Sequence, residues 1–267
     1  MIFQKEKRLE KILKITILQS ELHWENAEAN RASFSEKIQN IEGETDLIIL
    51  PEMFSTGFSM NAKKLAESNN GETLKWMVSE ARKKKCAITG SVIISENNKF
   101  YNRLFFVFPD GTYKKYDKKH TFTLAKENET YTAGTERLIV YYKGWKICPL
   151  VCYDLRFPVW ARNTEAYDVL IYVANWPKVR TLAWDTLLRA RAIENMAYCI
   201  GGNRVGFDGN DHEYVGHSAV YDVLGKQIST TSFEKEFTET MVLEKEHIES
   251  NRKKLQFLND RDSFTLT

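Results

Sequence analysis

Three short runs of almost wholly apolar residues constrain the fold of this chain more than any other feature. They are DLIILPE, KICPLVC and DVLIYVANW, at residues 46–52, 146–152 and 168–176, and KITILQSEL near the start is similar. Strands this apolar are typical of parallel strands that are buried on both faces and covered by helices. The runs therefore predict an α/β fold with helices on both sides of the sheet.

Helices and hairpins are predicted between these runs. Apolar residues recur at helical spacing in residues 26–41 and 181–199, and GETLKWMVSE leads into a lysine cluster that favours the C-terminus of a helix. An Asn-Asn pair and an Asp-Gly pair divide residues 91–119 into three antiparallel strands. The sequence thus predicts one mixed sheet, part buried parallel strands and part hairpins.

Charge and composition exclude several classes of function. The chain has 38 basic and 36 acidic residues, so its net charge of +2 makes no electrostatic case for nucleic acid or an acidic membrane surface. No apolar run approaches the roughly 20 residues that span a bilayer, and the N-terminal segment is too charged for a signal peptide. We expect a cytoplasmic protein with one domain over residues 1–267, including a charged N-terminal extension at residues 1–12.

Each apolar run ends in a residue that can take part in chemistry. The first ends at Glu52, the second at Cys152, and the third at Asn175 and Trp176. Sites in sheets of this kind form beyond the carboxyl ends of the strands. If the three strands are parallel neighbours, these residues converge in one crevice, which Lys118 could join from the basic segment after the hairpins.

Cys152 admits several interpretations. A disulfide with Cys148 is excluded because four residues of strand span about 13 Å, beyond the ~7 Å Cα limit. The same distance excludes a shared metal, and no other His or Cys pair has ligand spacing. Cys152 is then either a small buried hydrophobe, as we expect of Cys86, Cys148 and Cys199, or a nucleophile. A turn after Cys152 would supply backbone N–H groups for an oxyanion, which favours the nucleophile.

Four segments resemble those of the nitrilase superfamily of carbon–nitrogen hydrolases, whose members use a Glu–Lys–Cys triad. LPEMFSTGF is similar to the block around the glutamate, which corresponds to Glu52, and YDKKHTF to the lysine block, which corresponds to Lys118. VCYDLRFP is similar to the nucleophile block at Cys152, and KENETYTAG to the block of a supporting glutamate at Glu127. The resemblance covers nearly the whole chain in order and spacing.

The resemblance implies a fold and a mechanism. The fold is a four-layer α-β-β-α sandwich that pairs through helices into a homodimer or higher homo-oligomer, here through residues 159–168 and the helix from Thr181. Cys152 would attack an amide carbon while Glu52 takes the thiol proton. Lys118 and the backbone N–H of Tyr153 would hold the oxyanion. No metal and no cofactor are implied.

Within the superfamily, the chain is most similar to bacterial omega-amidases. The segments PEMFSTGFSM, CYDLRFPVWARN and NWPKVRTLAWDTLLRARAIENMAY carry this similarity, while Thr121 departs from the usual leucine and could alter the pocket wall. The similarity implies hydrolysis of the terminal amide of short 2-oxo dicarboxylic acid monoamides such as 2-oxoglutaramate, 2-oxosuccinamate and succinamate. Alternatives are a nitrilase, an N-carbamoyl amine hydrolase, or a scaffold protein without activity.

Candidate substrate contacts follow from the same segments. Phe58, Asn175 and Trp176 are expected in the pocket, with Phe54 and Tyr153 as further aromatic candidates. A substrate carboxylate needs a cation, and the two candidates after NWP are Lys178 and Arg180. Asp154 is expected to be structural in the turn after Cys152, where Arg156 is expected to pair with local acids or carbonyls. His120 and His217 are expected to be structural histidines.

Overall fold

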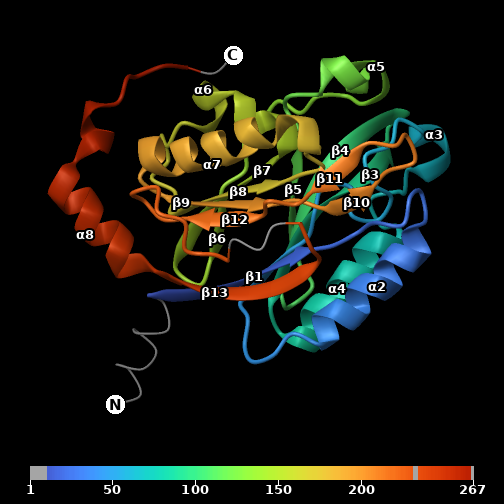
Figure 1. Cartoon of the computed structure of the whole chain (residues 1–267), viewed down its shortest axis with the longest axis horizontal. Helices are drawn as coiled ribbons and strands as arrows, with labels where there is room; N and C mark the ends of the chain where they lie inside the picture. Colours follow the sequence, from blue (N-terminus) through green and yellow to red (C-terminus); the bar gives the residue numbers. More distant parts are fainter. Residues whose placement is uncertain (1–10, 231–233, 266–267) are drawn as a thin grey trace.

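Two β-sheets packed face to face between helices make up the fold (Figure 1). We describe a computed structural model, which covers residues 11–230 and 234–265. The predicted four-layer α-β-β-α sandwich is confirmed. The prediction of a single mixed sheet is wrong, because the strands form two sheets, and each of them contains both parallel and antiparallel strands.

The first sheet has three parallel strands at its centre. Its order, within the described residues, is β13 (Phe237–Glu244), β1 (Ile12–Gln19), β2 (Leu47–Ile49), β3 (Ala87–Glu96), β4 (Lys99–Val107) and β5 (Tyr113–Asp117). β1, β2 and β3 are parallel, and the other neighbours are antiparallel. β1 begins at Ile12, so the end of the predicted N-terminal extension belongs to the sheet, while residues 1–10 lie outside the described residues.

The second sheet has the same plan. Its described order is β12 (Ala219–Tyr221), β9 (Tyr198–Gly202), β8 (Val169–Val173), β7 (Trp145–Val151) and β6 (Val140–Tyr142), and β7, β8 and β9 are parallel. A separate hairpin is formed by β10 (Val205–Phe207) and β11 (Glu213–Val215). Two of the three apolar runs are therefore parallel neighbours here, whereas the run that contains β2 lies in the opposite sheet.

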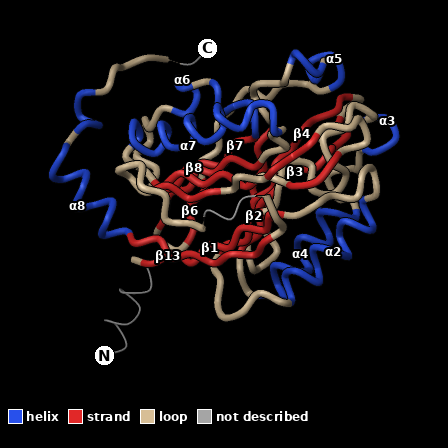
Figure 2. The backbone as a smooth tube through the Cα atoms, viewed as in Figure 1, coloured by secondary structure: helices blue, strands red, loops and turns tan. Residues whose placement is uncertain are grey.

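Helices cover the outer face of each sheet, as Figure 2 shows. On one side lie α2 (Ala27–Gln39) and α4 (Glu72–Lys84), and on the other α6 (Pro158–Ala161) and α7 (Thr181–Asn195). α8 (Lys245–Leu255) follows β13 at one end of the sandwich. Short helices complete the described part: α3 (Ala62–Leu65), α5 (Glu127–Thr130), η1 (Thr123–Ala125), η2 (Cys152–Arg156), η3 (Lys178–Arg180) and η4 (Phe257–Asp260).

The apolar run at β2 is buried on both faces because the sandwich has a core on each side of the sheet. Leu47 and Ile49 pack against the second sheet, while Ile48 and Leu50 pack under α2 and α4. All four are fully buried, and each contributes about 1.5–3 kcal/mol to folding. This explains why the run reads as continuously apolar although its side chains alternate.

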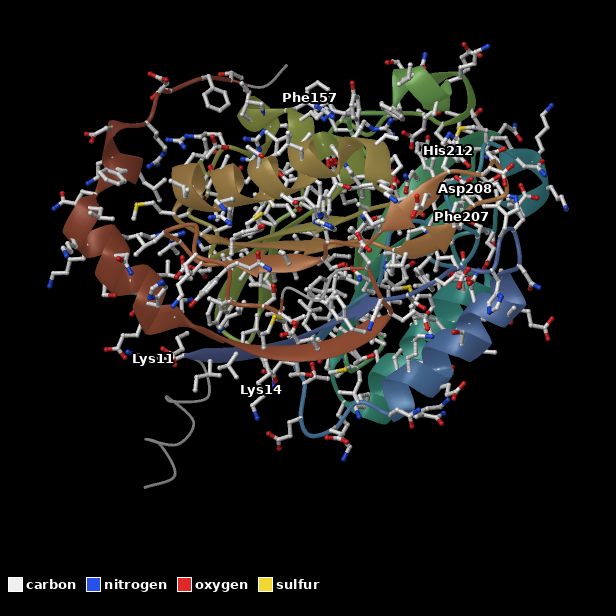
Figure 3. The ribbon with its side chains drawn as sticks, in the orientation of Figure 1. Lys11, Lys14, Phe157, Phe207, Asp208 and His212 are labelled. Atoms are coloured by element: carbon white, nitrogen blue, oxygen red, sulfur yellow. The ribbon has the colours of Figure 1, made fainter. Side chains whose placement is uncertain are left out.

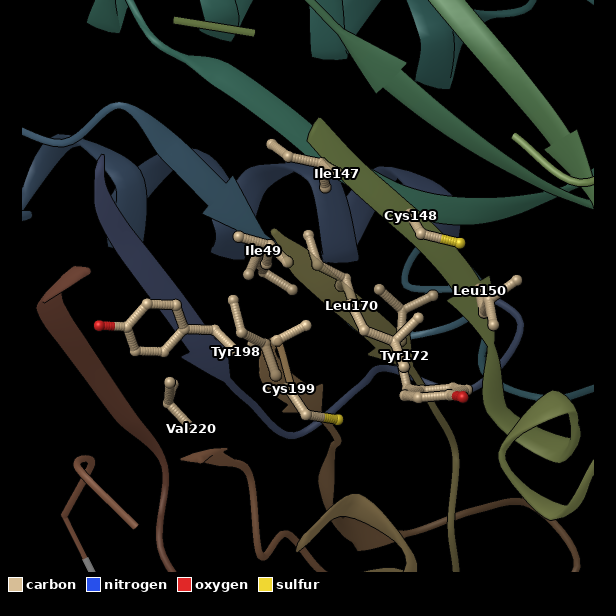
Figure 4. Packing of buried hydrophobic residues seen from close by; sticks show 14 of the residues in the cluster. Ile49, Ile147, Cys148, Leu150, Leu170, Tyr172, Tyr198, Cys199 and Val220 are labelled. Carbon is tan, nitrogen blue, oxygen red and sulfur yellow. The ribbon is translucent and has the colours of Figure 1, made fainter. Parts of the chain in front are cut away.

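Three of the four cysteines pack as small hydrophobic residues, as expected. Cys148 and Cys199 lie in the core around the second sheet, among side chains such as Leu170 and Tyr172 (Figure 4), and Cys86 lies under α4. All three are 0% exposed, and burial raises the pKa of the Cys86 and Cys148 thiols to about 12. None of them has access to a substrate.

Two predicted helices differ from the structure. Residues 159–168 form only the single turn of α6, because the Asn163 side chain binds both the N–H and the carbonyl of Tyr167 and closes a loop there. The helix predicted over residues 181–199 ends at Asn195, where Met196 adopts a left-handed conformation at φ 44°. The last predicted helical residues, Tyr198 and Cys199, begin β9.

Candidate active site

Cys152 lies in a strained turn at the end of β7. It is the first residue of η2 and has φ 44°, a backbone conformation that costs a non-glycine residue about 1–3 kcal/mol and that clusters at active sites. Asp154 folds the turn back onto the strand, since its Oδ2 accepts the N–H of Val151 (3.0 Å) and the hydroxyl of Tyr116 (2.7 Å). As a result, Cys152 lies at the end of a buried strand and is itself only 8% exposed.

Glu52 reaches the same place from the opposite sheet. It follows β2, it is 0% exposed, and three donors hold its carboxylate. Asn102 Nδ2 and Lys118 Nζ donate to Oε1 at 2.7 and 2.8 Å, and the backbone N–H of Asn175 donates to Oε2 at 2.8 Å. Because Asn175 follows β8 in the second sheet, this last bond joins the two sheets at the site.

Lys118 lies between two buried carboxylates. It is 1% exposed at the end of β5, and its Nζ donates to Glu52 at 2.8 Å and to Glu127 at 2.9 and 3.0 Å. Burial lowers the pKa of Lys118, but Glu127 and Glu52 outweigh burial and hold this pKa well above its usual range. Lys118 is therefore a fixed positive charge beside Cys152.

The same cluster raises the pKa values of Glu127 and of the Cys152 thiol. Burial raises the pKa of Glu127, with Lys118 opposing and the negative charge of Glu52 adding to the rise. Burial and the Glu52 carboxylate raise the pKa of the Cys152 thiol well above its ordinary value, although Lys118 acts in the opposite direction. Cys152 is thus a thiol at neutral pH, and a nucleophilic thiolate would form only as its proton leaves.

A cavity of about 500 Å³ opens above Cys152. The cavity wall includes all four predicted substrate contacts: Phe58, Asn175, Trp176 and Arg180. Asn175 also forms two hydrogen bonds with Glu52. The wall also includes residues from several loops and the β10–β11 hairpin: Trp24, Glu25, Ser59, Met60, Asn61, Phe122, Tyr153, Asp208, Asn210, His212 and Tyr214. Phe54 is core instead, with its ring 5.6 Å from that of Phe34.

Two arginines, not one, lie on the cavity wall. Arg180 places its guanidinium 5.0 Å from the centre of the Phe122 ring, and burial lowers the pKa of Arg180. Arg156 was expected to bind acids or carbonyls within its turn, but it lines the cavity with its guanidinium 5.0 Å from the Trp176 ring. Lys178 instead pairs with Glu213 at 2.9 Å and is not on this wall.

Several cavity residues carry no signal in the sequence. Asp208 and His212 lie together on the hairpin that closes one side of the site (Figure 3), and the Tyr214 hydroxyl donates to Asp208 at 2.9 Å. Only the folding of β10 against β11 brings these residues to the cavity. His120, in contrast, is structural as expected, since it lies 2.7 Å from Asp154 and stacks on Phe157. His217 likewise binds Asp185 at 3.0 Å, away from the cavity wall.

The described residues contain neither a cluster of metal-ligating side chains nor a membrane-spanning helix. Across residues 11–230 and 234–265, no group of three or more His, Cys, Asp or Glu side chains is placed to hold a metal ion. Within the same ranges, none of the helices has the length and apolarity that a membrane span requires.

A thiol on the wall of a cavity, with a buried carboxylate and a buried ammonium group beside it, is the arrangement used by hydrolases that work by acyl transfer. Comparison with known proteins identifies the family. The model of the carbon–nitrogen hydrolase family matches residues 14–250. The chain therefore belongs to the carbon–nitrogen hydrolase family, and it is an amidase of the nitrilase superfamily, as the motifs indicate.

Individual relatives agree with this assignment. Omega-amidase YafV of Escherichia coli (strain K12) is 43% identical over 254 residues, which cover 95% of this chain and 98% of that protein. The 2-oxoglutaramate amidase of Bacillus subtilis (strain 168) is 32% identical over 220 residues, or 80% of this chain and 85% of that protein. XC1258 of Xanthomonas campestris, a CN-hydrolase superfamily protein solved with an arsenic adduct in its active site, has a TM-score of 0.94 at 41% identity and covers 96% of this chain and 99% of its own.

Proposed function

We propose that the chain hydrolyses the terminal amide of short 2-oxo dicarboxylic acid monoamides, such as 2-oxoglutaramate and 2-oxosuccinamate, and also succinamate, to the acid and ammonia. The observation that carries the proposal is a cavity with two guanidinium groups on its wall and a thiol at its floor. The names of the relatives, omega-amidase and 2-oxoglutaramate amidase, support the same substrates.

In the first half of the reaction, Cys152 is the nucleophile. Its Sγ attacks the amide carbon while Glu52 takes the thiol proton, and the C=O bond opens to an oxyanion. Lys118 and the backbone N–H of Tyr153 stabilise the oxyanion, each such donor being worth about 10²–10³ in rate. Glu52 then protonates the leaving nitrogen, the C–N bond breaks, and ammonia departs from a thioester at Cys152.

In the second half, water completes the hydrolysis. Glu52 takes a proton from water, the hydroxide attacks the thioester carbon, and the C–S bond breaks to release the acid. Glu52 then returns the proton to the Cys152 sulfur and restores the thiol. Glu127 supports both halves by binding Lys118 through both carboxylate oxygens. Lys118 then keeps one position throughout the cycle.

The two arginines provide the basis for substrate choice. Arg156 and Arg180 form no ion pair with an acidic side chain anywhere in the described ranges of the chain. Guanidinium groups without a partner on a cavity wall suit a carboxylate, which they bind through paired hydrogen bonds. The aromatic rings of Phe58 and Trp176 would pack against the short carbon chain between the carboxylate and the amide.

A substrate panel tests the proposal. Ammonia release is measured from 2-oxoglutaramate, succinamate, a neutral amide of the same length such as butyramide, a simple nitrile and an N-carbamoyl amino acid. We expect the two anionic amides to react with the highest kcat/KM. Faster turnover of the nitrile or of the N-carbamoyl substrate would replace the proposal with one of those activities.

A matched pair of variants tests the arginines. Arg180→Met and Arg156→Met are expected to lower kcat/KM for succinamate by about 10- to 100-fold, because each loss of a charge-assisted contact costs about 1.5–3 kcal/mol. The value for butyramide is expected to stay within about threefold. Equal losses for the charged and the neutral amide would show that the arginines do not bind the carboxylate.

The proposal includes a cytosolic protein that assembles as a homodimer or higher homo-oligomer. Four cysteines without disulfide partners suit a reducing compartment. Val179 in η3 and Leu182 at the start of α7, 84% and 83% exposed, supply apolar surface that a second subunit would cover. The predicted contribution of residues 159–168 is reduced to α6, where Val159 is 54% exposed.

A further inference from the structure

Asn102 contacts three charged members of the site at once. It lies in β4 and is 1% exposed. Its Nδ2 donates to Glu52 Oε1 at 2.7 Å and to Glu127 Oε1 at 3.2 Å, and its backbone carbonyl accepts the backbone N–H of Lys118 at 3.0 Å. Because both amide hydrogens point at carboxylates, the orientation of the Asn102 amide is determined by its partners.

These bonds make the two oxygens of Glu52 unequal. Oε1 accepts from Asn102 and Lys118, which fills both of its lone-pair positions. Oε2 accepts one bond, from the N–H of Asn175, and keeps one position open. The Cys152 thiol forms a hydrogen bond with the Glu52 carboxylate, and because both positions of Oε1 are occupied, Oε2 is the oxygen left to accept it.

We propose that Asn102 is a positioning residue that, together with Lys118, occupies Oε1 of Glu52 so that Oε2 carries every proton of the reaction. This inference rests on the proposed amide hydrolysis. The thiol proton passes from Cys152 to Oε2 and then to the leaving nitrogen. In the second half, a proton from water passes to Oε2 and then to the Cys152 sulfur. Oε1 never changes its protonation state.

A neutral side chain with two donors is what this position requires. Glu52 and Glu127 carry negative charge against the single positive charge of Lys118. An aspartate at residue 102 would add a further buried negative charge, and a second ammonium would bind Glu52 so firmly that it could no longer take a proton. The amide of Asn102 binds both carboxylates without changing the net charge of the cluster.

The first test measures the pH dependence of ammonia release by Asn102→Ala and Asn102→Ser. N102A removes one donor that stabilises the Glu52 carboxylate, so we expect the acid limb of kcat/KM to move to higher pH. We expect kcat to fall about 10- to 100-fold, less than the full loss of a general base, with KM within about threefold. N102S keeps one donor and is expected between N102A and the wild type.

The second test does not depend on a substrate. Iodoacetamide alkylation of Cys152 is followed by intact mass across pH, with Cys152→Ala identifying any label elsewhere. In N102A we expect the pH at which the alkylation rate begins to rise to move in the same direction as the acid limb of kcat/KM. If the wild type released no ammonia from the panel, the proposed function would fail, while this readout would still decide the role of Asn102.

A buried asparagine outside the site is the control. Asn163 binds Tyr167 and Asn195 through three or more hydrogen bonds and is 0% exposed. Asn163→Ala is expected to lower Tm as N102A does and to leave both pH profiles unchanged. Unchanged profiles in N102A and N102S, or the same shift in N163A, would overturn the proposal and leave Asn102 a structural residue.

Discussion

At the residue scale, Cys152 is the position whose loss is most informative. Cys152→Ala removes the nucleophile and its thiol contact with Glu52. The bonds from Asn102, Lys118 and Asn175 still hold that carboxylate, so we expect the fold and Tm to be preserved. Ammonia release from 2-oxoglutaramate is expected to fall at least about 10³-fold. Intact mass should show an acyl adduct on the wild type during turnover and none on C152A. Full activity of C152A would refute the assignment.

Lys118 stabilises the buried cluster as well as the proposed oxyanion. Lys118→Met leaves Glu52 and Glu127 buried without their cation, and breaking a buried pair in this way costs about 3–5 kcal/mol. Burial raises the pKa of Glu127 and Lys118 opposes that rise, so without the cation this pKa lies further above its unfolded value. The cost is therefore present at neutral pH and declines as falling pH protonates Glu127.

Denaturant unfolding of K118M between pH 7 and pH 5 therefore tests the cluster. The difference in free energy of unfolding from wild type is expected to be largest at pH 7. The neighbouring Lys119, whose ammonium lies 5.3 Å from the Trp160 ring, is the control. Lys119→Met should change activity and the pH dependence little. A pH-independent deficit in K118M would contradict the assignment of charge within the cluster.

Sequence patterns locate Glu52, Lys118 and Cys152 because each follows a strand and belongs to a recognisable segment. They do not find Arg156, because nothing local distinguishes a guanidinium that lines a cavity from one that caps a turn. Asn102 leaves a weak signal: a residue of low strand propensity lies in the apolar strand KFYNRLFFV. What is missing in both cases is the identity of the partners, which come from segments distant in the sequence.

At the scale of elements, the loop after α5 presses directly on the end of β5. A Cβ at Gly134 would lie 2.1 Å from the carbonyl oxygen of Asp117, and the Gly134 N–H donates to the carbonyl of Lys118 at 2.9 Å. Gly134→Ala must therefore displace the backbone that carries Lys118. We expect a loss of about 1–3 kcal/mol in stability and a fall in kcat beyond what that loss explains.

A glycine far from the site provides the comparison for Gly134. Gly43 has φ +74° and open space around its Cβ position, so Gly43→Ala strains the backbone without moving a neighbour. We expect a loss of about 1 kcal/mol in stability from unfolding experiments and unchanged kcat. Equal kcat in G134A and wild type would show that the loop does not position Lys118.

The elements themselves were predictable where the pattern was local. The turn residues predict the three antiparallel strands in residues 91–119. Helical periodicity predicts the helix in residues 26–41, which Asn26 caps in the structure. The division into two sheets does not follow, since a run buried on both faces reads the same in either sheet. The helix over residues 159–168 failed for a different reason: the Asn163 side chain competes for the backbone groups that a longer helix would use.

At the scale of the whole molecule, the exposed apolar start of α7 predicts self-association. Light scattering after size-exclusion chromatography should give a dimer or higher oligomer for the wild type. Leu182→Glu is expected to reduce the mass toward that of one chain. Val242, 49% exposed on β13, is a matched control, and Val242→Glu should leave the mass unchanged. The same mass for wild type and L182E would place the interface elsewhere.

The reactive groups are divided between the two sheets, with Glu52 and Lys118 on one and Cys152 on the other. Activity therefore requires the two sheets to stay packed so closely that Glu52 and Lys118 remain within hydrogen-bonding reach of Cys152 and the substrate. A partly unfolded chain in which the sheets persist but slide apart would keep its circular dichroism and lose its activity. Ammonia release therefore reports on tertiary packing. On gentle heating, activity should be lost at a lower temperature than the circular-dichroism signal of the strands.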